Sequence, residues 1–197
     1  EEADQGRRHQ RVRHRSALAL LRCVSSSPAA AAATLRSRAL VDGNEGDVDE
    51  IGRRIVLDHG DDDDTVALDL SPGAEIEGSP EATRKRLLDF ARRAEAISVS
   101  EDAKLQGAAK EIKALLKSGF HPIIFCRFVD TADYVSRHLR DALPDKVKVT
   151  AVTGQLPPTE REARIAELTE EGGSYVLVCT DCLSEGINLQ DGFDAVL

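Results

Sequence analysis

The sequence predicts an α/β fold in which helices cover both faces of a parallel sheet. Short apolar runs alternate with stretches of helical period over residues 80–197. Several runs are continuously apolar, as in Val176-Leu177-Val178, which is typical of strands buried on both faces. Polar turns follow these runs at the carboxyl ends of the expected strands, where open α/β sheets bind ligands. The crossovers between parallel strands are expected to be right-handed.

Charge divides the 197-residue chain into three segments. Residues 1–41 carry eight arginines against three acids and are predicted to form a basic helical lead-in. Residues 42–81 carry fourteen acids against two arginines, and 42–79 are predicted to be an acidic flexible loop. Residues 80–197 hold the α/β domain. Because nearly all of the net charge of −9 comes from one block, the acidity does not exclude a nucleic-acid partner.

The composition favours one packed domain with a solvated appendage, since 41% of the residues are apolar and 31% are charged. No apolar run approaches the roughly 18 residues that span a bilayer, so we expect a cytoplasmic protein with no membrane partner. The chain begins Glu1-Glu2 without a methionine and stops at Leu197 inside an apolar run. We therefore expect an internal fragment of a longer protein.

Neither the cysteines nor the acidic run predicts a metal site. Cys179 and Cys182 form a lone C-x-x-C, without the second pair that a zinc site needs. Cys126 ends an apolar strand, where a reduced cysteine acts as a small hydrophobe, and Cys23 has no partner at disulfide-framework spacing. Asp61–Asp64 lacks the spaced ligands and the glycine of a calcium loop, so we expect it to be solvated.

The lead-in is predicted to contain two helices. Residues 9–24 have the pattern of a basic amphipathic helix. Ser27 is a good N-cap and Pro28 suits the first helical position, so a second helix is expected over residues 28–40. A run of alanines gives this second helix high propensity. The acidic segment that follows lacks the apolar residues to offset its ordering entropy.

The α/β domain is predicted to begin with two helices and a strand. Residues 80–97 suit a helix, and a second helix follows because six apolar residues recur at helical spacing. Ser118-Gly119 is expected to end that helix. Pro122–Cys126 predicts a buried strand, with proline tolerated at its start. The six residues of the stripe are Leu105, Ala108, Ala109, Ile112, Leu115 and Leu116.

A helix and a strand are expected next. Asp130 is predicted to cap the helix, and Pro144 stops it. Val147, Val149 and Ala151 alternate with polar residues and predict the second strand. The apolar stripe of the helix is Val135, Leu139, Ala142 and Leu143.

The remainder of the chain predicts one more helix and two strands. Thr159 and Glu162 have the spacing of a capping box, for a helix that runs to about Thr169. Tyr175–Cys179 is the third strand, and Phe193–Leu197 starts a fourth. The order of strands and helices is that of a parallel sheet.

Four segments, in family order, resemble the C-terminal RecA-like lobe of superfamily 2 helicases and Swi/Snf-type DNA translocases. The likeness covers about residues 100–197 well and 16–40 loosely. The Ser-Glu-Gly-Ile-Asn-Leu-Gln sequence at 184–190 resembles motif V, and it looks closer to bacterial RapA-like proteins than to eukaryotic remodellers. The resemblance implies a RecA-like sheet that stops before motif VI. The segments are Leu21–Pro28, Asp102–Leu105 leading into Gly119–Phe128, Val152–Arg161, and Tyr175–Gln190.

Four residues are candidates for binding nucleic acid. Arg127 and Phe128 follow the first strand, Gly154 follows the second, and Thr180 follows the third. Backbone amides, hydroxyls and helix N-termini at such ends can bind phosphates without reading sequence. Gly154 allows the backbone to approach a phosphate closely. The resemblance implies that these residues track one strand of the nucleic acid.

The resemblance also implies an ATP site, in which Gly186 and Asn188 lie against the nucleotide and Glu185 lies beside them. The chain has no G-x-x-x-x-G-K-[ST] phosphate loop. We also identify no Asp-Glu box that would hold Mg²⁺. ATP and Mg²⁺ would therefore be held mainly by a separate N-terminal lobe. The arginine-bearing motif VI is expected beyond Leu197. Because phosphoryl transfer needs all of these groups together, we expect the chain alone to be inactive as an ATPase.

These observations favour the C-terminal lobe of an ATP-dependent DNA helicase or translocase, an ATP hydrolase as part of the full protein. Its partners would be nucleic acid, with DNA favoured, and the N-terminal RecA-like lobe. The lobe would couple ATP binding and hydrolysis to movement on the nucleic acid. One alternative is a non-catalytic nucleic-acid-binding or interaction module that uses the basic first forty residues. Another is an unrelated doubly wound enzyme that binds a nucleotide or cofactor, although the chain contains no G-x-G-x-x-G.

Overall fold

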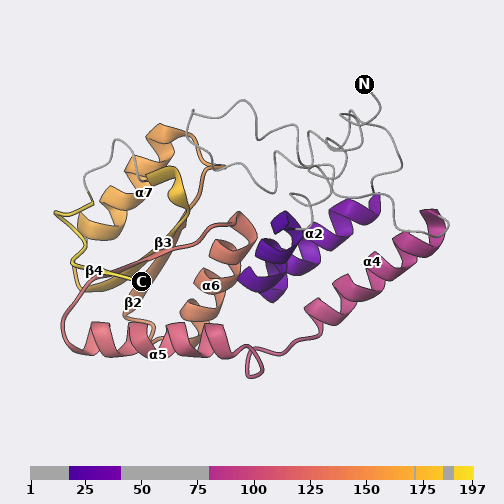
Figure 1. The fold of residues 1–197 in the computed structure, drawn as a ribbon. Coiled ribbons are helices and arrows are strands. Elements are labelled where there is room, and N and C mark those ends of the chain that lie inside the picture. The colour runs from indigo at the N-terminus through magenta and orange to yellow at the C-terminus, as the bar shows by residue number, and fades with distance from the viewer. Residues whose placement is uncertain (1–17, 41–79, 171, 184–188) are drawn as a thin grey trace. The chain divides into compact units, whose positions relative to one another are not determined.

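The computed structural model describes residues 18–40, 80–170, 172–183 and 189–197 (Figure 1). The predicted acidic loop at 42–79 lies outside the described residues, as does the first half of the helix predicted over 9–24. The described residues fall into two compact units, a helical unit of residues 18–40 and 80–97 and an α/β unit that begins at Ser98. No described helix is both long and apolar enough to cross a membrane.

The helical unit contains the two lead-in helices and helix α4. Residues 18–26 are helical, and α2 follows at Pro28–Leu40. The predicted start of α2 is confirmed, because the Ser27 hydroxyl accepts a hydrogen bond from the Ala30 amide at 3.1 Å. Helix α4 spans Pro80–Glu95, close to the predicted helix over 80–97.

Helix α4 packs on α2 within this unit (Figure 1). Ala91 of α4 is fully buried, and α2 presents a row of buried small side chains. Arg36 of α2 binds Glu95 of α4 through two hydrogen bonds of 2.7 and 2.6 Å. Contacts group α4 with the alanine-rich helix, and the compact α/β unit starts at Ser98. The predicted domain boundary at residue 80 stays a prediction. The buried alanines of α2 are Ala30, Ala31, Ala32 and Ala39.

The α/β unit is built on a four-stranded sheet with the order β2-β3-β1-β4. All of the pairings are parallel, as the sequence predicts. The strands are β1 (Pro122–Phe125), β2 (Val147–Val152), β3 (Ser174–Cys179) and β4 (Ala195–Val196). The observed strands lie within or close to the predicted runs.

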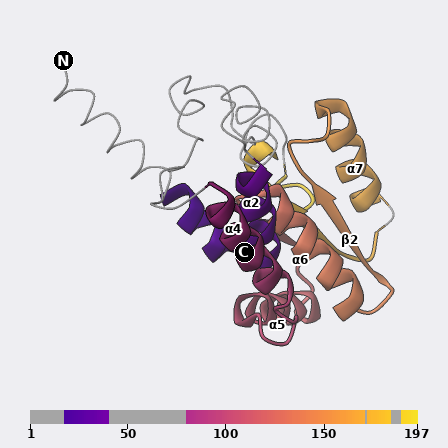
Figure 2. The same cartoon turned by 90° about the vertical axis from the view of Figure 1, so that its right-hand side faces the viewer.

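Helices cover both faces of this sheet, as expected from the continuously apolar strands. Helices α5 (Ala103–Lys117) and α6 (Val129–Ala142) lie on one face, and α7 (Pro158–Glu170) lies on the other (Figure 2). Alternate residues of each strand enter different cores. Val176 and Val178 of β3 pack against α5 and α6, whereas Leu177 packs in the core beneath α7.

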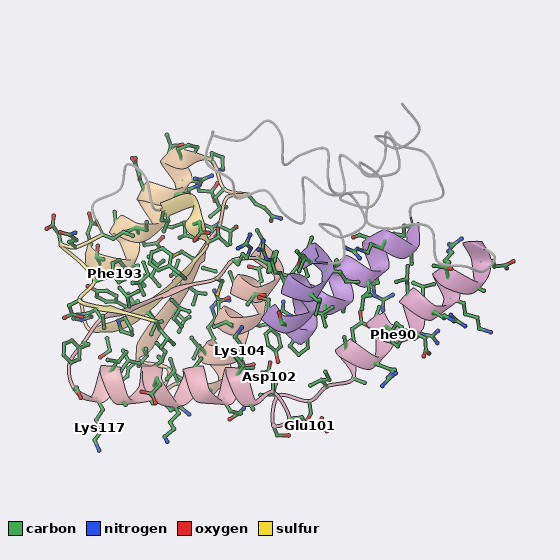
Figure 3. The ribbon with its side chains drawn as sticks, viewed as in Figure 1. Phe90, Glu101, Asp102, Lys104, Lys117 and Phe193 are labelled. Atoms are coloured by element: carbon green, nitrogen blue, oxygen red, sulfur yellow. The ribbon has the colours of Figure 1, made fainter. Side chains whose placement is uncertain are left out.

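Helix α5 ends where the sequence predicts, and Asp102 caps its start (Figure 3). The Asp102 carboxylate accepts a hydrogen bond from the Leu105 amide at 3.0 Å, which caps the helix. Gly119 follows the helix with φ of 87°, a conformation that favours glycine. The amide of Phe120 then donates to the Leu115 carbonyl over 3.1 Å and closes the end of the helix.

Two predicted helix caps are wrong. Helix α7 begins at Pro158, and the amides of Glu160 and Arg161 donate to the Pro157 carbonyl, so Thr159 lies inside the first turn. Proline suits the first helical position and displaces the predicted capping box there. Helix α6 likewise begins at Val129, one residue before the predicted cap Asp130, which lies in its first turn.

Candidate nucleic-acid interface at the strand ends

The carboxyl ends of β1, β2 and β3 are level at one edge of the sheet. Phe125 of β1 and Val152 of β2 both lie opposite Cys179 of β3. The alignment continues past the strands, because the Cys126 amide donates to the Cys179 carbonyl over 2.7 Å and the Thr180 amide donates to the Val152 carbonyl over 3.3 Å. The following turns therefore emerge side by side. They carry the predicted residues Arg127, Phe128, Gly154 and Thr180.

The Thr180 side chain is fully buried at this edge. Its hydroxyl oxygen accepts a hydrogen bond from the Gly154 amide at 3.3 Å. The turn after β3 thereby orients the peptide that follows β2. A direct contact between the Thr180 side chain and nucleic acid stays a prediction, because the hydroxyl here points into the fold.

Arg161, in the first turn of α7, holds the same turn through its carbonyls. Its Nε donates to the Leu156 carbonyl over 2.7 Å, and a terminal guanidinium nitrogen donates to the Gly154 carbonyl over 3.0 Å. Hydrogen bonds from a charged donor are about twice as strong as neutral ones. Gly154 is thus fixed on both sides, by Thr180 at its amide and by Arg161 at its carbonyl.

Arg161 has no predicted role, although it falls within a segment that resembles the helicase lobe. One signal could have found it. A cation in the first turn of a helix opposes the helix dipole, which favours acids at that position. An arginine at such a position is therefore expected to make a tertiary contact. In this structure Arg161 donates hydrogen bonds to two carbonyls of the Gly154 turn.

Arg127 and Phe128 form a paired contact beside the Gly154 turn. The guanidinium carbon of Arg127 lies 5.9 Å from the centroid of the Phe128 ring. Phe128 is only 5% exposed, whereas Arg127 is exposed. The ring therefore anchors the turn after β1 in the core, and the cation is the part of the pair that a ligand can reach.

An acidic residue lies at the N-terminus of α6, where its charge opposes the attraction of that helix end for anions. A helix N-terminus attracts phosphate, but Asp130 lies in the first turn of α6. Burial raises the pKa of the Asp130 carboxyl, and the neighbouring Asp133 raises it further. Anion binding at this edge therefore depends on Arg127 and on the backbone of the Gly154 turn.

The residues predicted to contact ATP, Glu185, Gly186 and Asn188, lie outside the described residues. The nearest described residues are Leu183 and Leu189. Leu183 is buried in the core beneath α7, and Leu189 packs against the same core. The ATP contacts stay predictions.

The described cysteine side chains act as core residues. Cys23, Cys126 and Cys179 are all buried thiols. Burial raises the pKa of Cys126 to about 11, with nearby Lys104 acting in the opposite direction. Within the described ranges, no group of three or more histidine, cysteine or acidic residues is placed to hold a metal ion.

Comparisons with known proteins match the α/β unit. Residues 104–194 match the family described as Helicase conserved C-terminal domain. A curated relative, ATP-dependent RNA helicase fal1 of Schizosaccharomyces pombe, is 34% identical over 68 residues. That alignment covers 34% of this chain and 16% of the relative, so the chain spans a small part of its length. No solved structure matches the chain.

Residues 104–194 are therefore similar to a helicase C-terminal domain, and the predicted RecA-like α/β fold with a parallel sheet is confirmed. Neither match names the Swi/Snf or RapA-like subtype, and the matched relative is named as an RNA helicase. The subtype and the DNA preference therefore stay predictions.

Proposed function

We propose that this chain is the C-terminal lobe of an ATP-dependent nucleic-acid translocase of the Swi/Snf, RapA-like type, acting on DNA in the cytoplasm. One observation carries the proposal. Gly154, at the carboxyl edge of a RecA-like sheet, is held by Thr180 at its amide and by Arg161 at its carbonyl. A turn held in this way is suited to binding a phosphate backbone repeatedly without reading its sequence.

The residues at this edge have two kinds of role: some contact the nucleic acid, and others orient the turn that contacts it. Arg127 reaches a phosphate directly, because its guanidinium is exposed and lies over the buried Phe128 ring. Gly154 allows the backbone of its turn to approach the strand closely. Thr180 and Arg161 act as positioning residues that set the orientation of this turn.

ATP would bind between this lobe and an N-terminal RecA-like lobe of the same protein. Gly186 and Asn188 would lie against the nucleotide, with Glu185 beside them. The N-terminal lobe would supply the phosphate loop and the Mg²⁺ ligands, which this sequence does not contain. Closure of the two lobes around ATP would then move the Gly154 turn along the strand.

ATPase measurements on the protein with both lobes test this proposal. Thr180→Ala is expected to lower the DNA-stimulated rate more than the basal rate, since it disturbs the nucleic-acid edge and leaves the nucleotide contacts in place. Thr180→Ser keeps the hydroxyl and serves as the matched control. Equal loss of both rates in Thr180→Ala would mean that Thr180 is only structural. Parallel titrations with RNA decide between the two nucleic acids.

The isolated chain provides a second test. We expect the purified 197-residue chain to hydrolyse no ATP, because the phosphate loop, the metal ligands and the arginine finger are outside it. The control is a Thr180→Ala, Gly186→Ala double variant. Turnover by the wild-type chain above that control would contradict the division of the ATP site between two lobes.

A further inference from the structure

Helix α4 of the helical unit carries an exposed row of two arginines and a phenylalanine, and Figure 3 shows where Phe90 lies on the helix. Arg86, Phe90 and Arg93 are spaced four and then three residues apart, which places them along one side of a helix. All three are exposed. We call these three residues the α4 row.

The aromatic ring in this row is not needed for packing. Phe90 is 49% exposed, whereas its neighbour Ala91 is fully buried on the side of α4 that packs on α2. The guanidinium carbon of Arg93 lies 5.7 Å from the centroid of the Phe90 ring. An arginine over an aromatic ring forms a flat cationic and π surface of the kind on which a nucleobase stacks.

The surrounding charges favour an anionic ligand. The described residues of the helical unit carry eight arginines and lysines against three acids. Two of those acids have cationic neighbours, because Glu95 binds Arg36 and Asp89 lies 3.9 Å from Arg92. Within the described ranges, no ion pair joins Arg86 or Arg93 to an acid.

We propose that the α4 row binds single-stranded nucleic acid, as a contact separate from the strand-end edge of the α/β unit. A base stacks on the Phe90 and Arg93 pair, and Arg86 meets a neighbouring phosphate. The exposed ring distinguishes this ligand from an acidic polypeptide, which would need the cations alone. The inference rests on the proposed nucleic-acid function but uses residues outside the helicase-like lobe.

Binding of a fluorescent oligothymidylate of about 15 nucleotides to the 197-residue chain tests the stacking contact. Phe90→Ala is expected to weaken binding about fivefold to tenfold, the lower part of the range for one stacked base. Phe90→Leu keeps an apolar side chain without a π face and should lose as much. Full affinity in either variant would overturn the proposal. Circular dichroism checks that both variants stay folded.

The charge contact is tested by salt dependence. Arg86→Ala should reduce the slope of log affinity against log salt by about 0.7, the value for one phosphate contact on a single strand. Arg92→Ala is the matched control, because it removes one charge from another face of the same helix. Equal effects of the two substitutions would show a diffuse charge effect and contradict a defined site.

Two further outcomes separate this inference from the proposed function. If polyglutamate binds the chain with the same dependence on Phe90, an acidic protein partner is indicated and the α4 row is not a nucleic-acid site. If Phe90→Ala binds normally while Thr180→Ala still loses DNA-stimulated ATPase activity in the two-lobe protein, only the α4 proposal fails. If Thr180→Ala is the variant that behaves normally, the strand-end proposal fails instead.

Discussion

An arginine lies over a phenylalanine ring in each of the two units, at 5.9 Å in the α/β unit and at 5.7 Å in the helical unit. The two rings differ in their surroundings. Phe128 is 5% exposed and anchors a turn, whereas Phe90 is 49% exposed and lies on a helix surface. The same pair of residue types therefore fixes backbone in one unit and presents a flat surface in the other.

The difference extends to how each unit would hold a nucleic-acid strand. At the strand ends, the binding groups are a backbone turn and one exposed cation, kept in place by buried or half-buried side chains. On α4, the binding groups are themselves exposed side chains. Substitutions at the strand ends should therefore change stability together with function, and substitutions in the α4 row should change affinity alone.

The two phenylalanines give the largest expected contrast. Phe128→Ala removes a buried ring and should lower the free energy of unfolding by about 3–5 kcal/mol. Phe90→Ala removes a ring that is half in water and should cost about 1 kcal/mol or less. Urea titrations followed by circular dichroism measure both. Similar losses in the two variants would break the comparison.

Arg161→Ala is expected to have the next largest effect. The substitution removes two charge-assisted hydrogen bonds to the Leu156 and Gly154 carbonyls and should cost about 2 kcal/mol of unfolding free energy. Arg164→Ala is the control, since its exposed pair with Glu160 is worth about 0.3–0.5 kcal/mol. If the two losses are equal, Arg161 does not hold the turn.

Removal of the Thr180 hydroxyl tests the other side of that turn. Thr180→Val keeps the shape of the side chain but takes away the acceptor for the Gly154 amide, which should cost about 1–3 kcal/mol. Thr180→Ser keeps the hydroxyl and should recover a part of the loss. A valine variant as stable as wild type would show that the 3.3 Å hydrogen bond contributes nothing.

The smallest expected effect is the pH dependence of the helical unit. Arg36 donates two hydrogen bonds to the Glu95 carboxylate, and these hold the pKa of Glu95 below the ordinary value of 4.5. A carboxyl with a lowered pKa stabilises the fold above its ordinary pKa, and the contribution is lost as pH falls through the lowered value. Helicity of wild type and Glu95→Gln, followed from neutral pH to below 4.5, tests this. The glutamine variant should have a weaker acid dependence, and an unchanged dependence would exclude Glu95 as its source.

Much of the fold follows from local patterns in the sequence. Ser27 and Pro28 mark the start of α2, and Gly119 marks the end of α5, because caps and turns depend on a few adjacent residues. The continuously apolar strands predict a sheet covered on both faces, and the two cores confirm it. These features need no information about distant contacts.

The features that the sequence did not predict depend on tertiary contacts or on competing local preferences. Arg161 has its role only because the turn after β2 folds back over the first turn of α7. Pro158 displaces Thr159 from the cap because proline suits the first helical position. The place of α4 in the sequence predicts that it belongs with the α/β domain, but its buried Ala91 lies in the unit that also contains α2.

Photo-crosslinking of a thiothymidine-containing oligonucleotide to the two-lobe protein tests the central claim most directly, because it reports where the strand lies. We predict crosslinked peptides that contain Arg127 and the turn after Gly154, with weaker crosslinks at Phe90. The lysines on the outer face of α5, such as Lys110 and Lys117, provide a basic control surface. Crosslinks concentrated on α5, and absent from the strand ends, would contradict the claim that this edge of the sheet binds nucleic acid.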